Sequence, residues 1–311
     1  MSESGSAARR DGVVHLLVPY WGDPTLLDQT VASVLAQDDD RWALTIVDDC
    51  YPDPAAQQRW DGHPDPRLTY VRNDTNLGVT GNFERCRTLV AHELAAFPGC
   101  DDLLHPSYVR RVRAAFDAFP DAAVFQPGVH VVNDHDAEVH GLAERVKSWL
   151  RPRVDVPTQL RGERLATGLL HGDWLYWPSL AFRAEALAHR PFRQDLPVIL
   201  DLALIMDVVT DGGGLVLDPE VSFTYRRHDA SASSTARFDG QRFRDEERFH
   251  HEVVARLDEL GWRRARRAAR WHATSRLHAV SLLPAALRTR DHGQVRTLLG
   301  HALGRTQDPG A

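Results

Sequence analysis

Short apolar runs alternate with helical patterns through the first half of this chain, and no other feature restricts its fold as strongly. Residues 13–18 read VVHLLV, a run rich in β-branched side chains that ends at Pro19. Residues 44–47 (LTIV) and 68–71 (LTYV) repeat this pattern, and 122–126 (AAVFQ) returns to it. Continuous apolar runs of this length are typical of parallel strands that are buried on both faces.

Helical patterns separate these runs. Asp23 and Pro24 provide the N-cap acceptor and the first-turn proline of a helix start. The apolar face of this helix is predicted to consist of Leu27, Val31, Val34 and Leu35. Further helices are predicted over residues 81–95 and 106–119, and residues 239–311 have helical patterns only. The alternation of strands and helices predicts an α/β sandwich around a mostly parallel sheet.

Polar clusters follow three of the predicted strands. They are YWGD at residues 20–23, the pair Asp48-Asp49, and the pair Asp101-Asp102. Ligands of such sheets bind beyond the carboxyl ends of the strands, so we expect these clusters to line one crevice. Carboxylates in that position suit Mg²⁺ or Mn²⁺, which proteins hold with one or two carboxylates plus substrate phosphates. A solvated pair at a helix entry is the alternative interpretation of Asp101 and Asp102.

Composition narrows the function classes. The chain has 37 Lys+Arg against 43 Asp+Glu, whereas dedicated nucleic-acid-binding proteins carry a strong basic excess. Its three cysteines form no C-x-x-C, which argues against a disulfide framework or a structural zinc site. No apolar run approaches the roughly 20 residues of a membrane span, and the start MSESGSAARRDG lacks the apolar segment of a secretory signal. We therefore expect a soluble cytoplasmic enzyme.

The motifs of several other enzyme classes are missing. Lys147 is the only lysine, and it lies in no motif for Schiff-base chemistry or for a lysine-dependent phosphate loop. No G-x-G-x-x-G follows the first predicted strand, which disfavours a nicotinamide-dependent dehydrogenase. A nucleotidyltransferase would need a glycine-rich basic loop there, and PYWGDPT is neither glycine-rich nor basic.

An ordered series of motifs resembles the family-2 glycosyltransferases of the GT-A fold, a three-layer α/β sandwich. The resemblance covers roughly residues 12–235. In chain order, the matching segments are 13–49 with VPYWGD, LLDQTVASVLAQ and LTIVDD; 71–86 (VRNDTNLGVTGNFERC), similar to an N-x-G-x-x-x-x-N block; 99–102, at the position of a D-x-D metal motif; 171–187 (HGDWLYWPSLAFRAEAL), similar to the acceptor-side region; and 225–231 (YRRHDAS), similar to the end of the catalytic domain.

The resemblance implies transfer of a sugar from a nucleotide-diphosphate sugar to an acceptor hydroxyl, with inversion at the anomeric carbon. It implies that Asp201 is the catalytic base and that Asp101, with Asp102, holds Mn²⁺ or Mg²⁺ on the diphosphate. His228 is a further candidate metal ligand, with an ordinary surface or hydrogen-bonded histidine as the alternative. The nucleotide-binding positions that the resemblance implies are Pro19, Tyr20, Trp21, Asp23, Asp49, Gly78, Cys100 and Asp101.

Three aromatic residues are candidates for the acceptor side: Trp174, Tyr176 and Trp177. Aromatic rings stack on the apolar faces of sugars. The alternative is that at least two of the three pack in the core. The implied acceptor is a glycan, a lipid-linked sugar or a small molecule, and no nucleic acid is expected as a partner.

Two positions depart from the family pattern. Gly99 replaces the first acidic residue of the D-x-D motif, and Leu200 replaces the acidic residue that usually precedes the base. Asp195 and Asp207 are rival bases. The departures keep open a catalytically silent protein that binds nucleotide-sugars and, less strongly, a nucleotidyltransferase. Pro98 is also unexpected in the strand before the metal motif, because it removes a ladder donor.

The predicted organisation is a disordered tail over residues 1–11, a catalytic domain over 12–235 and a helical extension over 236–311. Residues 262–311 hold ten Arg and two Asp, so the extension is basic. Two interpretations of the arginine-rich helix at 262–276 stay open. One is contact with an anionic membrane surface at the inner face of the membrane. The other is an amphipathic helix that packs on the catalytic domain and exposes its arginines.

Overall fold

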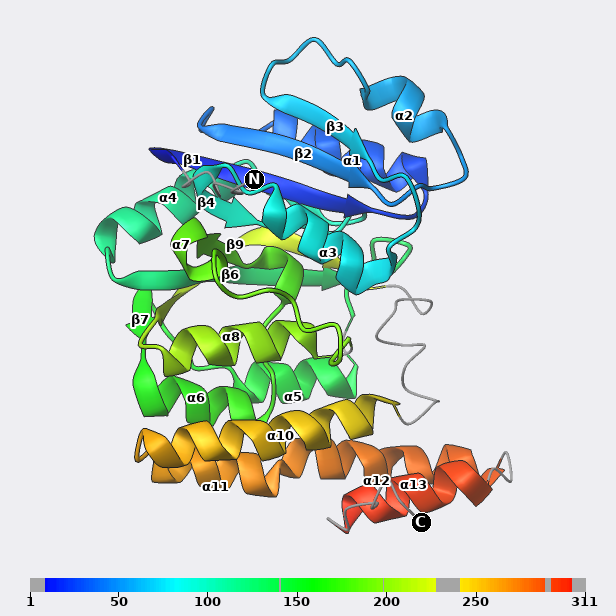
Figure 1. Cartoon of the computed structure of the whole chain (residues 1–311), viewed down its shortest axis with the longest axis vertical. Helices are drawn as coiled ribbons and strands as arrows, with labels where there is room; N and C mark the ends of the chain where they lie inside the picture. The colour runs from blue at the N-terminus through cyan, green and yellow to red at the C-terminus, as the bar shows by residue number, and fades with distance from the viewer. Residues whose placement is uncertain (1–8, 140, 198, 228–240, 289–291, 304–311) are drawn as a thin grey trace, which may run out of the picture.

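The computed structural model describes residues 9–139, 141–197, 199–227, 241–288 and 292–303. These residues form one sheet of nine strands in the order β3-β2-β1-β4-β8-β6-β9-β5, with β7 also paired to β9 (Figure 1). The strands are β1 (Arg9–Tyr20), β2 (Trp42–Asp48), β3 (Leu68–Arg72), β4 (His92–Ala96), β5 (Leu103–Leu104), β6 (Ala122–Val132), β7 (Thr158–Leu160), β8 (Ala181–Arg183) and β9 (Gly214–Arg226).

Helices cover both faces of this sheet, and a further helical layer lies at the end of the molecule away from β3 (Figure 1). The helices of the sandwich are α1 (Pro24–Leu35), α2 (Ala55–Trp60), α3 (Gly78–Thr88), α4 (Tyr108–Ala118), α5 (Leu142–Leu150), α6 (Gly162–His171), α7 (Ala184–Leu187) and α8 (Leu200–Thr210), with a 3-10 turn η1 (Trp177–Ser179). The C-terminal layer contains α10 (Gln241–Glu259), α11 (Arg263–Trp271), α12 (Ala273–Arg288) and α13 (His292–Ala302).

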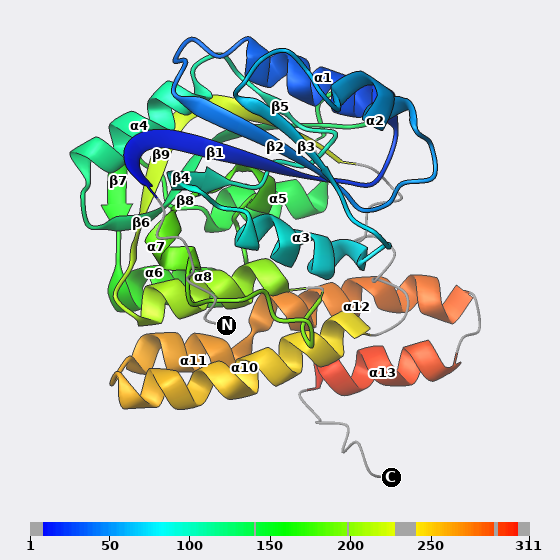
Figure 2. The ribbon, with the colours of Figure 1, turned by 45° about the horizontal axis from the view of Figure 1, so that its top comes forward.

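The predicted mostly parallel α/β sheet is confirmed. The ladders β1–β2, β2–β3, β1–β4 and β6–β9 are parallel, while the short strands β5, β7 and β8 pair antiparallel. Both faces of β1 are buried, because Leu17 packs in one core with α3, α6 and α8 while Leu16 and Val18 pack in the other with α1 and α4 (Figure 2). This two-sided burial explains why residues 13–18 form a continuous apolar run.

Four local predictions need correction. The helix predicted over 81–95 ends at Thr88, and its second half is strand β4, whose Leu94–Ala96 segment pairs with β1 and β8. Pro98 lies beyond β4, so it removes no ladder donor. Leu35 is exposed rather than packed on the sheet. Strand β1 begins at Arg9, so the predicted tail is wrong for residues 9–11, and residues 1–8 lie outside the described residues.

The arginine-rich segment consists of two helices rather than one. Helix α11 ends at Trp271, and α12 starts after His272, which has a positive φ of 24°. The buried face of α11 consists of Ala265, Ala268 and Ala269 and contacts α6 and α10, so α11 packs on the α/β sandwich. Contact with a membrane surface stays a prediction. No helix in the described residues is long and apolar enough to cross a bilayer.

Candidate active site

The predicted polar clusters meet at the carboxyl edge of the parallel strands. Tyr20 pairs in register with Asp48, and the Asp49 N–H donates to the Tyr20 carbonyl at 3.0 Å. The loop after β4 joins the same edge, since a Cβ on Gly22 would lie 3.7 Å from the Cys100 Sγ atom. The end of β9 completes it through Arg226, whose backbone N–H donates to Asp102 Oδ1 at 3.0 Å.

Asp48 is the centre of a polar network that the sequence motifs did not identify. Its carboxylate is fully buried and accepts from the Tyr51 N–H at 2.8 Å, the Tyr70 hydroxyl at 2.5 Å and the Arg72 guanidinium. The Tyr51 ring packs edge-on against the predicted nucleotide-binding residues Tyr20 and Trp21, with ring centroids 5.4 and 5.2 Å apart. Trp21 itself is half-exposed, so this network supports an aromatic wall that is open to ligand.

Asp49 anchors the loop that leads into α3. Its buried carboxylate accepts from the Leu77 N–H at 2.8 Å, the Gly78 N–H at 2.9 Å and Asn73 Nδ2 at 2.9 Å. Gly78 has φ +72°, a conformation that glycine adopts without strain. The contact of Asp49 with a nucleotide base stays a prediction; the hydrogen bonds show a carboxylate that fixes the position of Gly78.

The remaining predicted nucleotide-binding positions have clear structural roles. Pro19 lies in β1 opposite Val47, and the Tyr20 hydroxyl donates to the Gly22 carbonyl at 2.9 Å. Asp23 caps α1 by accepting from the Thr25 N–H at 2.8 Å. Burial raises the pKa of the Cys100 thiol to about 12, so this group is neutral at physiological pH.

Asp102 is a fully buried carboxylate that backbone N–H groups hold in place. Its Oδ2 accepts from Gly99 at 3.0 Å and its Oδ1 from Arg226. Burial and the neighbouring charge of Asp101 hold the pKa of Asp102 well above its ordinary value. The buried Arg226 also donates to the Asp101 carbonyl at 2.8 Å, so one residue of β9 holds the backbone of Asp101 and the carboxylate of Asp102.

Gly99 has a steric reason to be glycine. A Cβ at this position would lie 2.6 Å from Asp101 Oδ1 and 2.6 Å from Asp102 Oδ2. The two carboxylates therefore converge on the space that a side chain would occupy, and an acidic residue at this position would clash with both. Converging carboxylate oxygens are a donor set that a hard cation such as Mg²⁺ or Mn²⁺ prefers.

These two carboxylates fit a cation that completes its shell with phosphate and water oxygens. Within the described residues no group of three or more His, Cys, Asp or Glu side chains is arranged to hold a metal. The predicted ligand His228 lies outside the described residues.

Asp201 lies in the first turn of α8, where its Oδ1 accepts from the Leu202 N–H at 2.8 Å. Helix α8 ends at Thr210, and a tight glycine turn leads from there into the amino end of β9. The last turn of α8 therefore lies at the amino edge of the sheet. Its first turn, which contains Asp201, lies toward the carboxyl edge. Leu200, which replaces an acidic residue of the family pattern, is buried in the core.

The rival bases have other surroundings. Asp195 pairs with Arg193 at 2.5 Å and with Arg248 at 3.3 Å, and Arg193 lowers the pKa of Asp195. Asp207 lies nearly two turns along α8 from Asp201, where burial and then Asp211 raise its pKa. Of the three aspartates, only Asp201 lies in the first turn of α8.

The predicted acceptor-side aromatics separate into core and groove residues. Trp174 is 1% exposed, so its predicted contact with an acceptor is wrong. Trp177 stacks on Phe97 with ring centroids 6.0 Å apart and also packs against Phe182, which places it in the core. Tyr176 alone lines an open groove.

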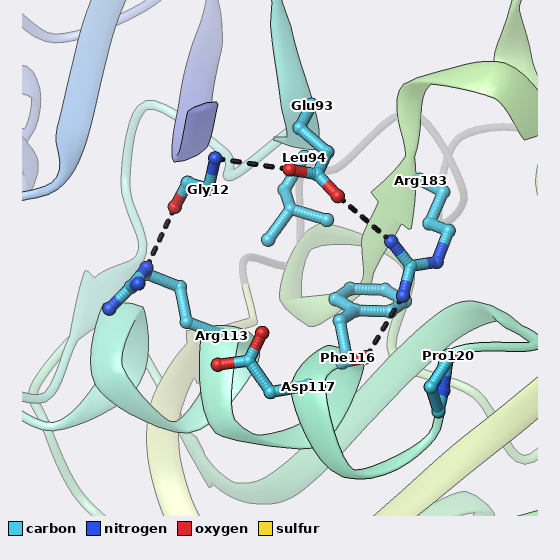
Figure 3. A pocket seen from close by; sticks show the side chains of 8 residues that line it. All are labelled: Gly12, Glu93, Leu94, Arg113, Phe116, Asp117, Pro120 and Arg183. Carbon is cyan, nitrogen blue, oxygen red and sulfur yellow. Dashed lines mark hydrogen bonds and ion pairs between the residues drawn. The ribbon is translucent and has the colours of Figure 1, made fainter. Parts of the chain in front are cut away.

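This groove has a volume of about 680 Å³ and lies between α5 and the second half of β6. Its lining residues are Val129, His130, Val131, Glu138, Val139, Glu144, Arg145, Ser148, Trp149, Arg153 and Tyr176. A second cavity of about 310 Å³ lies at the opposite, amino edge of the sheet (Figure 3). Its Glu93 accepts from the Gly12 N–H at 3.0 Å and from Arg183 at 3.1 Å, so its polar groups tie β1, β4 and β8 together.

The sequence is similar to a family model and to several known proteins. Residues 16–172 match the model of glycosyl transferase family 2. The putative colanic acid biosynthesis glycosyl transferase WcaA of Escherichia coli is 35% identical over 72 residues, which are 23% of this chain and 26% of that protein. An uncharacterized Mycobacterium tuberculosis protein is 24% identical over 230 residues, which are 72% of this chain and 69% of that protein. The chain spans 15% of a third relative, an uncharacterized protein of Sinorhizobium fredii.

Two solved structures resemble the whole chain. S. aureus TarS 1–349 in complex with UDP-GlcNAc has 12% identity and a TM-score of 0.64, over 95% of this chain and 93% of that one. The mannosyltransferase PcManGT from Pyrobaculum calidifontis, in complex with GDP-Man and Mn²⁺, has 15% identity and a TM-score of 0.59, over 97% and 90%. At these identities the likeness is one of fold.

Proposed function

Because the chain belongs to glycosyl transferase family 2 and has the GT-A fold, we propose that it transfers a sugar from a nucleotide-diphosphate sugar to an acceptor hydroxyl. The observation that carries this proposal is the meeting of aromatic and acidic side chains at the carboxyl edge of the sheet. There the aromatic wall of Trp21 and Tyr51 faces the same edge as the converging carboxylates of Asp101 and Asp102. An aromatic wall suits a nucleoside, and paired carboxylates suit a metal-bound diphosphate.

The donor class is supported by the solved neighbours, since TarS is bound to UDP-GlcNAc and PcManGT to GDP-Man and Mn²⁺. In this chain Asp101 and Asp102 would hold Mn²⁺ or Mg²⁺. When bound, that cation neutralises the negative charge that develops on the departing nucleotide diphosphate. Arg226 keeps both acidic residues in place from β9, and Asp49 fixes the loop at Gly78 that borders the nucleotide.

We assign the removal of the acceptor proton to Asp201. Its carboxylate would take the proton as the acceptor oxygen attacks C1 from the face opposite the leaving group, which inverts the anomeric carbon. Asp201 comes from α8 and the metal loop from the segment after β4, so base and leaving group are served by separate elements. An in-line displacement needs the base and the leaving group on opposite faces of C1.

A thermal-shift screen of UDP-, GDP-, dTDP- and CDP-sugars with Mn²⁺ tests the proposed function. A bound donor stabilises the fold by mass action, by about 2.7 kcal/mol at one hundred times its dissociation constant. We expect one nucleotide class to raise Tm. An unchanged Tm with all four classes of nucleotide-sugar would contradict the proposed function. Slow hydrolysis of the stabilising donor separates an enzyme from a catalytically silent binding protein.

Gly99→Ala tests the metal assignment without removing a carboxylate. We expect the Mn²⁺-dependent affinity for the stabilising donor to fall about 10- to 100-fold, because the new Cβ displaces the Asp101 and Asp102 oxygens. Isothermal titration calorimetry with and without Mn²⁺ measures the effect. Gly141→Ala is the matched control, since a Cβ there meets no atom within 4 Å. Equal affinities for the two variants would show that the metal does not depend on this convergence.

A further inference from the structure

We propose that the groove between α5 and β6 binds the carbohydrate part of the acceptor, with Trp149 as the ring on which a sugar stacks. This inference rests on the proposed function and adds to it the chemical class and the location of the acceptor. Trp149 is 78% exposed although it is a large aromatic residue, and it lines the groove together with Arg145 and Ser148 of the same helix.

Helix α5 is held in place by contacts of Glu144 and Lys147 with neighbouring segments. Glu144 accepts from the Tyr176 hydroxyl and from Arg227, both at 2.5 Å. Lys147 donates to the Leu175 carbonyl at 2.6 Å and lies 4.6 Å from the centre of the Tyr176 ring. These contacts order the helix while Trp149 stays open to solvent. A binding residue on an ordered element loses little conformational entropy when its ligand arrives.

The groove adjoins the metal loop. Val131, one of its lining residues, pairs with Tyr225 of β9, and the next pair in the ladder is Val132 with Arg226. Arg226 is the residue that holds Asp101 and Asp102. Tyr176 also packs on Tyr225, with ring centroids 5.8 Å apart. An acceptor chain in the groove therefore lies beside the site where its hydroxyl must react.

The lining favours a carbohydrate over a lipid. Most of the lining side chains are charged or polar, beside three valines and the exposed indole, and His130 and Glu138 form a pair at 2.9 Å. Arg145 and Arg153 have no acidic partner among the described residues, so their N–H groups can meet a ligand. Sugars combine an apolar CH face, which suits an aromatic ring, with hydroxyl groups, which need many hydrogen-bond partners. A hydrocarbon chain would leave these polar groups desolvated and unpaired.

The test uses the full chain, Mn²⁺, the donor from the thermal-shift screen and a panel of fluorescently labelled maltotriose, cellotriose and chitotriose. For the best acceptor we expect Trp149→Ala to raise the acceptor KM about three- to tenfold, the range of one aromatic stacking contact. Hydrolysis of the donor in the absence of acceptor should not change. Trp149→Phe keeps an aromatic face and should restore most of the affinity.

Trp271→Ala is the matched control, because Trp271 is similarly exposed but lies on α11. An unchanged KM for Trp149→Ala, with transfer intact, would overturn the groove assignment and leave the proposed function standing. A loss of donor hydrolysis together with transfer would also overturn it, since Trp149 would then act on the donor side. Absence of donor hydrolysis and transfer in the unmodified chain would overturn both proposals.

Discussion

Asp201→Asn is expected to lower the rate of sugar transfer by about 10²–10⁴, the usual effect of removing a general base. The substitution keeps the size of the side chain and an oxygen that can accept the Leu202 N–H, so α8 should retain its first turn. Asparagine cannot take the acceptor proton. Steady-state kinetics with saturating donor and acceptor measure the loss, and the donor dissociation constant should stay within about twofold.

Asp207→Asn is the control for this prediction, because it removes a carboxylate from the same helix nearly two turns away. Its transfer rate should match that of the unmodified chain. If Asp201→Asn kept its transfer rate within about tenfold while Asp207→Asn lost activity, Asp207 and not Asp201 would be the base.

Asp101→Ala has the second large expected effect. Asp102 cannot replace the missing carboxylate, since the N–H groups of Gly99 and Arg226 hold its side chain in place and it would already be the second ligand of the cation. We expect the Mn²⁺-dependent component of donor binding to disappear, a loss of about 100-fold or more, while binding without metal is retained. Calorimetric titration of the donor, with Mn²⁺ and with EDTA, separates the two components.

Asp117→Ala removes an exposed carboxylate from the cavity at the other edge of the sheet and serves as the control. Its donor affinity should respond to Mn²⁺ as in the unmodified chain. If Asp101→Ala did likewise, the cation would be held by other groups and the role of the loop after β4 would have to be reassigned.

The sequence predicted the sheet well because its central strands are buried on both sides. Such strands need apolar side chains at every position, and residues 13–18 and 44–47 show this requirement directly. The acidic pairs were also found, because they follow strands whose carboxyl ends meet at one edge. The prediction was wrong for β4, where a helix was expected because the Leu and Ala residues of HELAA favour helices. Pairing with β1 and β8 decides its conformation, and that information lies far away in the chain.

Part of the site was missed for the same reason, because its contacts join residues that lie far apart in the chain. Asp48, Tyr51 and Arg72 form a network across more than 20 residues of sequence, and no local pattern announces it. The position of Arg72 at the end of β3, beside Asp48 in register, was the available signal. Aromatic character alone could not distinguish buried Trp174 from exposed Trp149, because the difference depends on which helix face the core covers.

Lys147 gives the molecule an unusual chemical handle. It is the only lysine in 311 residues, so an amine-reactive dye or cross-linker has one side chain to modify. That side chain ties α5 to the segment before η1, beside the Tyr176 ring. The rate at which Lys147 is labelled therefore reports how firmly its contacts with the Leu175 carbonyl and the Tyr176 ring are kept.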